Sequence, residues 1–196
     1  MEKESLKSFN FMTKFILHGG STSTPNELNG KFFSEITKDV PEGGRVLIVY
    51  FSRKEEDYDK LFEQDKSNFL NNTGGKKLKL IIASKEQFVS QIKEVDAVYM
   101  RGGDTSKLLK VLKQNPSFEK VIRNKTVAGS SAGAYVLSRY FFSRDTNNVH
   151  EGLGVLPIKI ACHYEDQQVT LNKLKEYGDN LEIILLKDYE FKIFNQ

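Results

Sequence analysis

The chain has 196 residues, of which 39% are hydrophobic and 28% are charged, which is typical of one soluble globular domain with a buried core. The net charge of +3 is small and the lysines are scattered along the chain, which argues against a nucleic-acid-binding protein. No apolar run reaches the roughly 20 residues needed to span a membrane.

Cys162 is the single cysteine, so an intrachain disulfide is impossible, as suits a reducing compartment. Residues 1–10 are polar and charged and lack the apolar core of a signal peptide. We therefore expect a cytoplasmic protein in which residues 1–196 form a single domain and residues 1–12 form a loose tail.

The first two thirds of the chain alternate between strand and helix patterns. In chain order we predict a strand over 14–18 ending in a glycine turn, a helix over 26–38, a strand over 45–51, a helix over 55–70, a strand over 77–83, a helix over 85–93, a strand over 96–100, and helices over 106–114 and 118–123. This alternation predicts an α/β fold, with a doubly wound, mostly parallel sheet and helices on both faces.

The last third begins with a short strand from Thr126 and a helix over 134–140. Residues 141–151 are polar and irregular, and 152–157 are rich in turns. A strand over 158–161, a helix over 168–177 and a last strand over 181–186 then follow.

The stretch from Thr126 to Ala134 contains Gly129, Ser131 and Gly133 in the pattern G-x-S-x-G, the nucleophile elbow. In that motif the serine lies at a strained turn between a strand and a helix, where its hydroxyl projects from the backbone. The small neighbours leave room for substrate, and the helix N-terminus offers N–H groups to an oxyanion. The alternative interpretation is a Gly/Ser-rich turn without chemistry.

Three polar segments follow predicted strands: His18 with its two glycines, residues 101–104, and residues 129–131. The carboxyl ends of parallel strands meet at one edge of a sheet, where functional groups collect. We therefore expect these segments to lie together.

A serine nucleophile needs a base to accept its proton. Among the three histidines, His163 follows a predicted strand and is the favoured base. His150 is expected at the solvated surface, and His18 is expected either to touch substrate or to be structural. Cys162 is a rival nucleophile.

A carboxylate is needed to orient the imidazole of the base. Asp188 and Glu190 follow the last strand and are the candidates. Glu165 and Asp166 are less favoured because they lie so close to the histidine in sequence.

Four motifs together resemble the dipeptidase E family of serine peptidases, which are relatives of cyanophycinase. These motifs are Arg101–Thr105, Gly129–Ala134, Gly154–Pro157 and Cys162–Tyr164. The resemblance runs from about Lys14 to the C-terminus, with the motifs in the same order.

The resemblance implies a fold like that of class I glutamine amidotransferases, with serine in the position of their cysteine. It implies Ser131 as nucleophile and His163 as base, with the backbone N–H groups of Gly103 and Ala132 forming the oxyanion hole. The third catalytic residue would be Asp188, with Glu190 as the alternative. The activity of the type member is hydrolysis of dipeptides with an N-terminal aspartate.

The chain departs from the family at two points. Arg101 stands where a glycine or small residue is common, and the C-terminal hairpin is expected to be short or missing. We expect Arg101 to bind an acidic group of the substrate, with Asp104 holding it when no substrate is bound. The alternative is that Arg101 points to solvent or pairs only with Asp104. Gly102 and His18 complete the expected substrate contacts.

The leading hypothesis is a serine hydrolase of short peptides, without a metal or organic cofactor. Other hypotheses are an esterase or amidase on the same machinery, and a peptide or small-molecule sensor without turnover. The expected partner is a small peptide rather than nucleic acid or membrane, and the protein is expected to be a monomer or a homodimer.

Overall fold

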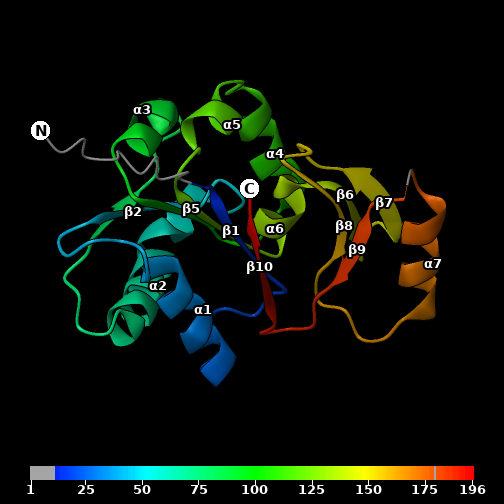
Figure 1. Ribbon diagram of the computed structural model, residues 1–196, viewed down its shortest axis with the longest axis horizontal. Helices are drawn as coiled ribbons and strands as arrows, with labels where there is room; N and C mark the ends of the chain where they lie inside the picture. The colour runs from blue at the N-terminus through cyan, green and yellow to red at the C-terminus, as the bar shows by residue number, and fades with distance from the viewer. Residues whose placement is uncertain (1–11, 179) are drawn as a thin grey trace, which may run out of the picture.

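A computed structural model describes residues 12–178 and 180–196, so residues 1–11 of the expected tail lie outside the described residues. Strands and helices alternate over most of the chain (Figure 1). In chain order the elements are β1 (Lys14–His18), α1 (Glu27–Thr37), β2 (Arg45–Val49), a 3-10 turn (Glu55–Asp57), α2 (Tyr58–Asn72), β3 (Lys79–Ile82), α3 (Phe88–Lys93), β4 (Ala97–Met100), α4 (Thr105–Lys113), α5 (Phe118–Val121), β5 (Thr126–Ser130), α6 (Ala132–Leu137), β6 (Ser138–Ser143), β7 (Asn148–Glu151), β8 (Leu156–Ala161), α7 (Gln168–Glu176), β9 (Glu182–Leu185) and β10 (Phe191–Asn195).

The strands form two sheets. The larger sheet has the order β10-β1-β5-β4-β2-β3, and all its pairings are parallel except that of β10 with β1. The smaller sheet has the order β7-β6-β8-β9 and lies beside the larger one (Figure 1). The predicted α/β class with a mostly parallel sheet is confirmed, and the smaller sheet is an addition to it.

Helices cover both faces of the larger sheet. Alternate residues of β2 show this, because Val46 and Ile48 pack with residues of α1 and α2, such as Phe32. Leu47 and Val49 belong to the core on the other face, which includes residues of α3, α4, α5 and α6. Burial on both faces explains why this strand is apolar throughout rather than alternating with polar residues.

The carboxyl ends of β1, β5 and β4 meet at one edge, as the sequence predicted. His18 pairs with Ser130, and Met100 pairs with Gly129, in adjacent parallel ladders. This register places the glycine turn after β1, the loop after β4 and the elbow after β5 side by side.

The segment after the elbow differs from prediction. The helix predicted over 134–140 ends at Leu137, and the backbone is extended at Ser138, whose hydroxyl donates to the Tyr135 carbonyl at 2.8 Å. The supposedly irregular 141–151 region forms most of the antiparallel pair β6 and β7. Aromatic Tyr140, Phe141 and Phe142 favour a strand here, because such residues pack well on a pleated surface.

Among the described residues, β9 and β10 form no hairpin with each other because they belong to different sheets, which agrees with the short or missing hairpin that was expected. β10 pairs antiparallel with β1 over five positions, from Lys14 with Asn195 to His18 with Phe191. The residues between β9 and β10 therefore connect the smaller sheet to the larger one, next to the turn after β1.

Within the part of the chain that the structure describes, no helix has both the length and the apolar character to cross a membrane. The cytoplasmic location stays a prediction.

Candidate active site

Ser131 occupies the turn between β5 and α6 with φ 50° and ψ −107°. A positive φ is uncommon for a residue with a side chain and is the strain expected of a nucleophile elbow. Two backbone hydrogen bonds fix the turn, from the Ser131 N–H to the His18 carbonyl (2.9 Å) and from the Tyr135 N–H to the Ser131 carbonyl (2.9 Å).

The two glycines of the elbow are required by close packing. A Cβ on Gly129 would overlap the Gly133 carbonyl, and a Cβ on Gly133 would overlap the Met100 carbonyl at the end of β4. The G-x-S-x-G spacing therefore lets α6 begin directly against β5 and β4, which directs the serine toward the sheet edge.

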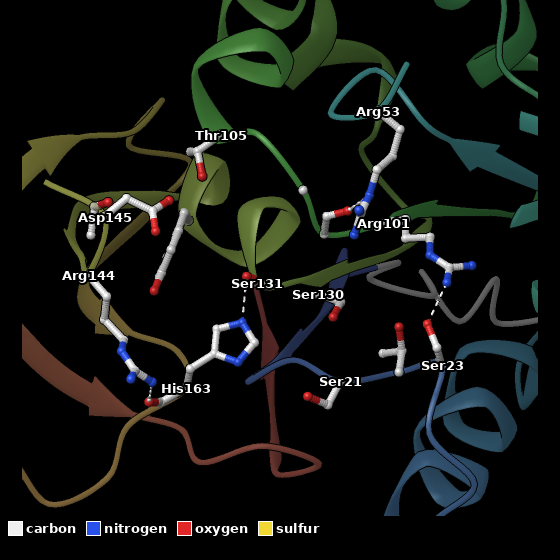
Figure 2. A pocket seen from close by; sticks show the side chains of 15 residues that line it. Ser21, Ser23, Arg53, Arg101, Thr105, Ser130, Ser131, Arg144, Asp145 and His163 are labelled. Carbon is white, nitrogen blue, oxygen red and sulfur yellow. Dashed lines mark hydrogen bonds between the residues drawn. The ribbon is translucent and has the colours of Figure 1, made fainter. Parts of the chain in front are cut away.

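His163 follows β8 and reaches the serine from the smaller sheet. Its Nε2 lies 3.0 Å from Ser131 Oγ, and its Nδ1 lies 2.6 Å from Asp188 Oδ1 (Figure 2 shows the first of these contacts). With Nδ1 protonated and donating to the carboxylate, Nε2 is free to accept the serine proton. The arrangement has the order and distances of a Ser-His-Asp triad.

The glycine pair after β1 makes room for the histidine, a role that the sequence analysis missed. A Cβ on Gly20, where φ is +134°, would overlap the His163 imidazole, and a Cβ on Gly19 would overlap the Lys187 carbonyl. The Gly19 carbonyl also accepts the His163 N–H at 3.0 Å. Two glycines directly after a first strand were the available signal.

The other carboxylates near the site have different partners. Glu190 Oε2 accepts the N–H of Lys187 at 2.9 Å, which closes the turn that carries Asp188. Glu165 pairs with Arg144, and Asp166 pairs with Lys187. The geometry therefore favours Asp188 over Glu190 as the residue that orients His163.

The two residues expected to form the oxyanion hole lie in the elbow and in the loop after β4. Ala132 is the first residue of α6, so its N–H has no acceptor within the helix. Gly102 and Gly103 line the same pocket as Ser131, in the loop after β4.

The pocket has a volume of about 590 Å³ and opens over Ser131 and His163. Figure 2 shows Arg144 and Asp145 on one side of the serine, and Arg53, Arg101 and Ser23 on the other. It is large enough for a small peptide, since ligand sites of this kind span roughly 300–1,000 Å³.

Residues 15–191 match the sequence model of the family described as peptidase family S51. The chain belongs to this family. The match spans most of the chain and confirms the resemblance to the dipeptidase E family, and with it the class of serine peptidases. None of the curated proteins matches the sequence significantly.

Two solved structures share the fold of this S51 peptidase. A peptidase from an acI-B1 Actinobacterium has a TM-score of 0.69 at 16% identity, covering 93% of this chain and 83% of its own. A protein assigned as a peptidase E from Listeria monocytogenes EGD-e has a TM-score of 0.63 at 18% identity, covering 94% of this chain and 98% of its own. At such identities the likeness concerns the fold alone.

The structure corrects the environment predicted for Arg101. Its side chain is 3% exposed and forms an ion pair with Asp65 of α2, which is fully buried, at 2.8 Å between Nη1 and Oδ1. Its Nη2 donates to Ser23 Oγ (2.6 Å) and Gln64 Oε1 (3.0 Å), and its Nη1 donates to the Leu61 carbonyl (3.3 Å). The charge is thus already neutralised, and the guanidinium ties the loop after β1 to α2.

Asp104 does not hold Arg101, contrary to both interpretations offered from the sequence. Its side chain caps α4 by accepting the Lys107 N–H at 3.1 Å, and its other oxygen lies 3.9 Å from Lys107 Nζ. The N-cap position satisfies a helix N–H that would otherwise lack a partner, which explains an aspartate at this point of the sequence.

We expect Arg101→Met to lower the free energy of unfolding by about 3–5 kcal/mol, because it leaves the buried Asp65 carboxylate without its cationic partner and with only the Tyr50 hydroxyl bonded to it among the described contacts. Adding Asp65→Asn should recover much of the loss by removing that charge. Urea denaturation of both variants checks this. Unchanged stability together with a raised KM for acidic peptides alone would instead favour direct substrate binding by Arg101.

His18 is completely buried and structural, so the alternative of substrate contact is wrong. Its Nε2 lies 3.0 Å from Asn29 Oδ1, and its Nδ1 accepts the Gly20 N–H at 3.0 Å. Burial lowers the pKa of His18 to about 4, so the ring is neutral at pH 7. It fixes the conformation of the glycine turn beneath the His163 ring.

The remaining two candidates from the sequence are explained by their surroundings. Cys162 is buried, and burial raises the pKa of its thiol, which keeps it protonated and unreactive. His150 lies in β7, stacks on Phe141 and contacts the Thr146 hydroxyl at 2.6 Å, away from the triad.

We expect Asp188→Asn to lower turnover by up to about 10⁴-fold, because an amide can favour the wrong imidazole tautomer. Glu190→Gln is the matched control and should be far milder, since the Glu190 side chain accepts a backbone N–H of the turn, and an amide oxygen can accept it too. Steady-state kinetics on the same peptide compares them. A crippled Glu190→Gln enzyme beside an active Asp188→Asn enzyme would reverse the assignment.

Proposed function

We propose that this S51 peptidase hydrolyses short peptides through an acyl-enzyme intermediate on Ser131. The observation that carries the proposal is the continuous chain from Ser131 Oγ through His163 to Asp188, at 3.0 Å and 2.6 Å, at the floor of a peptide-sized pocket. Covalent acyl transfer requires a nucleophile within hydrogen-bond distance of a base, and a third group that orients the base. The three side chains here meet both conditions.

The proposed reaction has two halves. Ser131 Oγ attacks the scissile carbonyl carbon while its proton moves to His163 Nε2, and the carbonyl oxygen becomes an oxyanion facing the Gly103 and Ala132 N–H groups. The C–N bond then breaks as His163 returns the proton to the leaving amine. Water attacks the acyl-enzyme in the same way, giving a carboxylic acid and free serine.

A preference for acidic peptides finds support in the charge of the pocket. Arg53, Arg101 and Arg144 line it together with a single carboxylate, Asp145. The Arg101 charge is neutralised by Asp65, whereas the Arg144 side chain is 49% exposed. Arg144 forms an ion pair with the exposed Glu165 and donates to the His163 carbonyl at 3.0 Å. We therefore assign recognition of an acidic substrate group to Arg144 rather than to Arg101.

Arg144→Ala should raise KM for acidic peptides by about 10- to 100-fold, which corresponds to about 1.5–3 kcal/mol for a hydrogen bond to a charged group. Arg123→Ala, an exposed arginine outside this pocket, is the matched control. The KM change is measured for Asp-Ala, Ala-Ala and their C-terminally amidated forms. This comparison distinguishes recognition of the aspartyl side chain from recognition of the C-terminal carboxylate. Equal KM changes for all four peptides would exclude recognition of either acidic group.

A panel of dipeptides, aminoacyl p-nitroanilides and simple esters tests the proposed function. The proposal predicts cleavage of short peptides, fastest with an acidic residue, and complete dependence on Ser131. Hydrolysis of esters but no peptides would favour an esterase. Failure to cleave any of them, with peptides binding to the intact pocket, would favour a sensor.

A further inference from the structure

Two residues that follow β2, Ser52 and Arg53, form hydrogen bonds to several consecutive peptide groups of the loop after β4. Ser52 Oγ donates to the Arg101 carbonyl at 2.9 Å, and the Ser52 carbonyl accepts the Asp104 N–H at 2.9 Å. Between these two contacts, Arg53 Nε donates to the Gly102 carbonyl at 2.6 Å. A short, charge-assisted hydrogen bond of this kind is among the stronger contacts available to a backbone carbonyl.

The Gly102 carbonyl and the Gly103 N–H belong to the same peptide unit. A trans peptide is planar and directs its C=O and N–H in opposite directions, so a donor that holds the oxygen also sets the direction of the N–H. The structure has no cis peptide bond among the described residues, so this peptide is trans. The Arg53 contact therefore determines where the Gly103 N–H points.

The packing around Gly103 allows little freedom. Its φ is +155°, and a Cβ there would lie 2.6 Å from the Ser52 carbonyl oxygen and 2.8 Å from Arg53 Nε. The glycine is thus needed so that Ser52 and Arg53 can approach the loop. The Arg53 main chain is itself anchored, because its N–H donates to the Tyr50 carbonyl at 2.7 Å.

We propose that Arg53 is a positioning residue of the oxyanion hole: its guanidinium orients the Gly102–Gly103 peptide and polarises it, which makes the Gly103 N–H a stronger donor to the developing oxyanion. This inference rests on the proposed function. A cation bound to a peptide oxygen draws electron density from the N–H, and hydrogen bonds in a chain reinforce one another. The effect is greatest when negative charge develops on the substrate oxygen, so it acts on the transition state.

This role differs measurably from that of a residue that binds a substrate carboxylate. A contact that strengthens only in the transition state changes kcat, whereas a contact made equally in the ground state changes KM. If Arg53 acts through Gly103, replacing it should lower kcat equally for acidic and neutral peptides, because every substrate forms the same oxyanion.

The experiment compares Arg53→Met, Arg53→Gln and Arg53→Lys with Lys54→Met, which removes the same charge from the next, exposed residue. We expect Arg53→Met to lower kcat by about 10- to 100-fold, somewhat less than the roughly 10²–10³-fold loss on deleting a whole oxyanion donor. KM should stay within about twofold. Arg53→Lys and Arg53→Gln, which keep a donor, should restore part of kcat, and Lys54→Met should match the wild type.

A second readout is the rate at which a fluorophosphonate labels Ser131, because its P=O oxygen enters the same hole. Labelling should slow in Arg53→Met in parallel with kcat, while circular dichroism and the melting temperature show a folded protein. Arg53→Gln, which preserves shape and one donor, supplies the comparison if Arg53→Met does not fold.

Two results would overturn the inference: a KM that rises for acidic peptides alone with kcat unchanged, or labelling of Ser131 at the wild-type rate in both Arg53→Met and Arg53→Gln. Either result would leave the proposed peptidase function intact. If the wild-type protein were neither labelled at Ser131 nor active on any peptide, the proposed function would be wrong, and this inference would be wrong with it.

Discussion

Ser131→Ala should lower kcat/KM for the best peptide substrate by about 10⁴-fold or more, because it removes the group that forms the acyl-enzyme. The protein should remain folded, since the Ser131 side chain lies at the pocket rather than in the core. Residual hydrolysis can persist through binding and the oxyanion hole. Kinetics together with circular dichroism measures both effects.

Ser130→Ala is the matched control for the elbow. Ser130 is the last residue of β5, next to Ser131 in sequence, and it is only 2% exposed. It lacks the positive φ that marks Ser131 as the elbow residue. Its replacement should be far milder. A Ser130→Ala enzyme that is inactive beside an active Ser131→Ala enzyme would mean that the nucleophile has been assigned one residue out of place.

His163→Ala should cost about as much as Ser131→Ala, again about 10⁴-fold or more, because serine cannot attack efficiently without a base. The double variant should be little worse than either single variant, since the two residues act as a unit through the 3.0 Å contact between Nε2 and Oγ. Activity measurements on all three variants complete the cycle. Losses that multiply in the double variant would mean that the residues act independently.

The rival thiol gives a separate control for these two variants. Cys162→Ser should keep nearly full activity, because the Cys162 side chain is buried and lies behind the site, with Sγ 3.7 Å from the His18 carbonyl. Loss of activity in Cys162→Ser, combined with inactivation of the wild type by iodoacetamide, would contradict the serine mechanism.

The sequence predicted those parts of the molecule that depend on local patterns. The apolar strands, the glycine turns and the G-x-S-x-G spacing each have a local physical cause, and together they predicted an α/β sheet with three loops at one edge. The register of β1, β5 and β4 confirms that edge. The choice between Asp188 and Glu190 was harder, because residues two apart share a face of a strand and sequence alone does not separate them.

The missed features depend on contacts between distant segments. Arg101 was expected to face the substrate, but its partner Asp65 lies 36 positions earlier in α2, and no local pattern links the two. The sequence did not predict the strand β6, because its extended conformation is stabilised by pairing with β7 and β8, and that pairing is visible only in the folded chain. Likewise, the role of Gly20 emerges only when β8 delivers His163 against it.

Covalent labelling identifies the nucleophile directly, because the labelled side chain is the one that attacks. Wild-type protein is treated with a fluorophosphonate, digested, and mapped by mass spectrometry. We expect a single adduct on Ser131 that is absent from Ser131→Ala and strongly reduced in His163→Ala. An adduct on Ser130 or Cys162, or equal labelling of the wild type and Ser131→Ala, would contradict the assignment of Ser131 as the nucleophile.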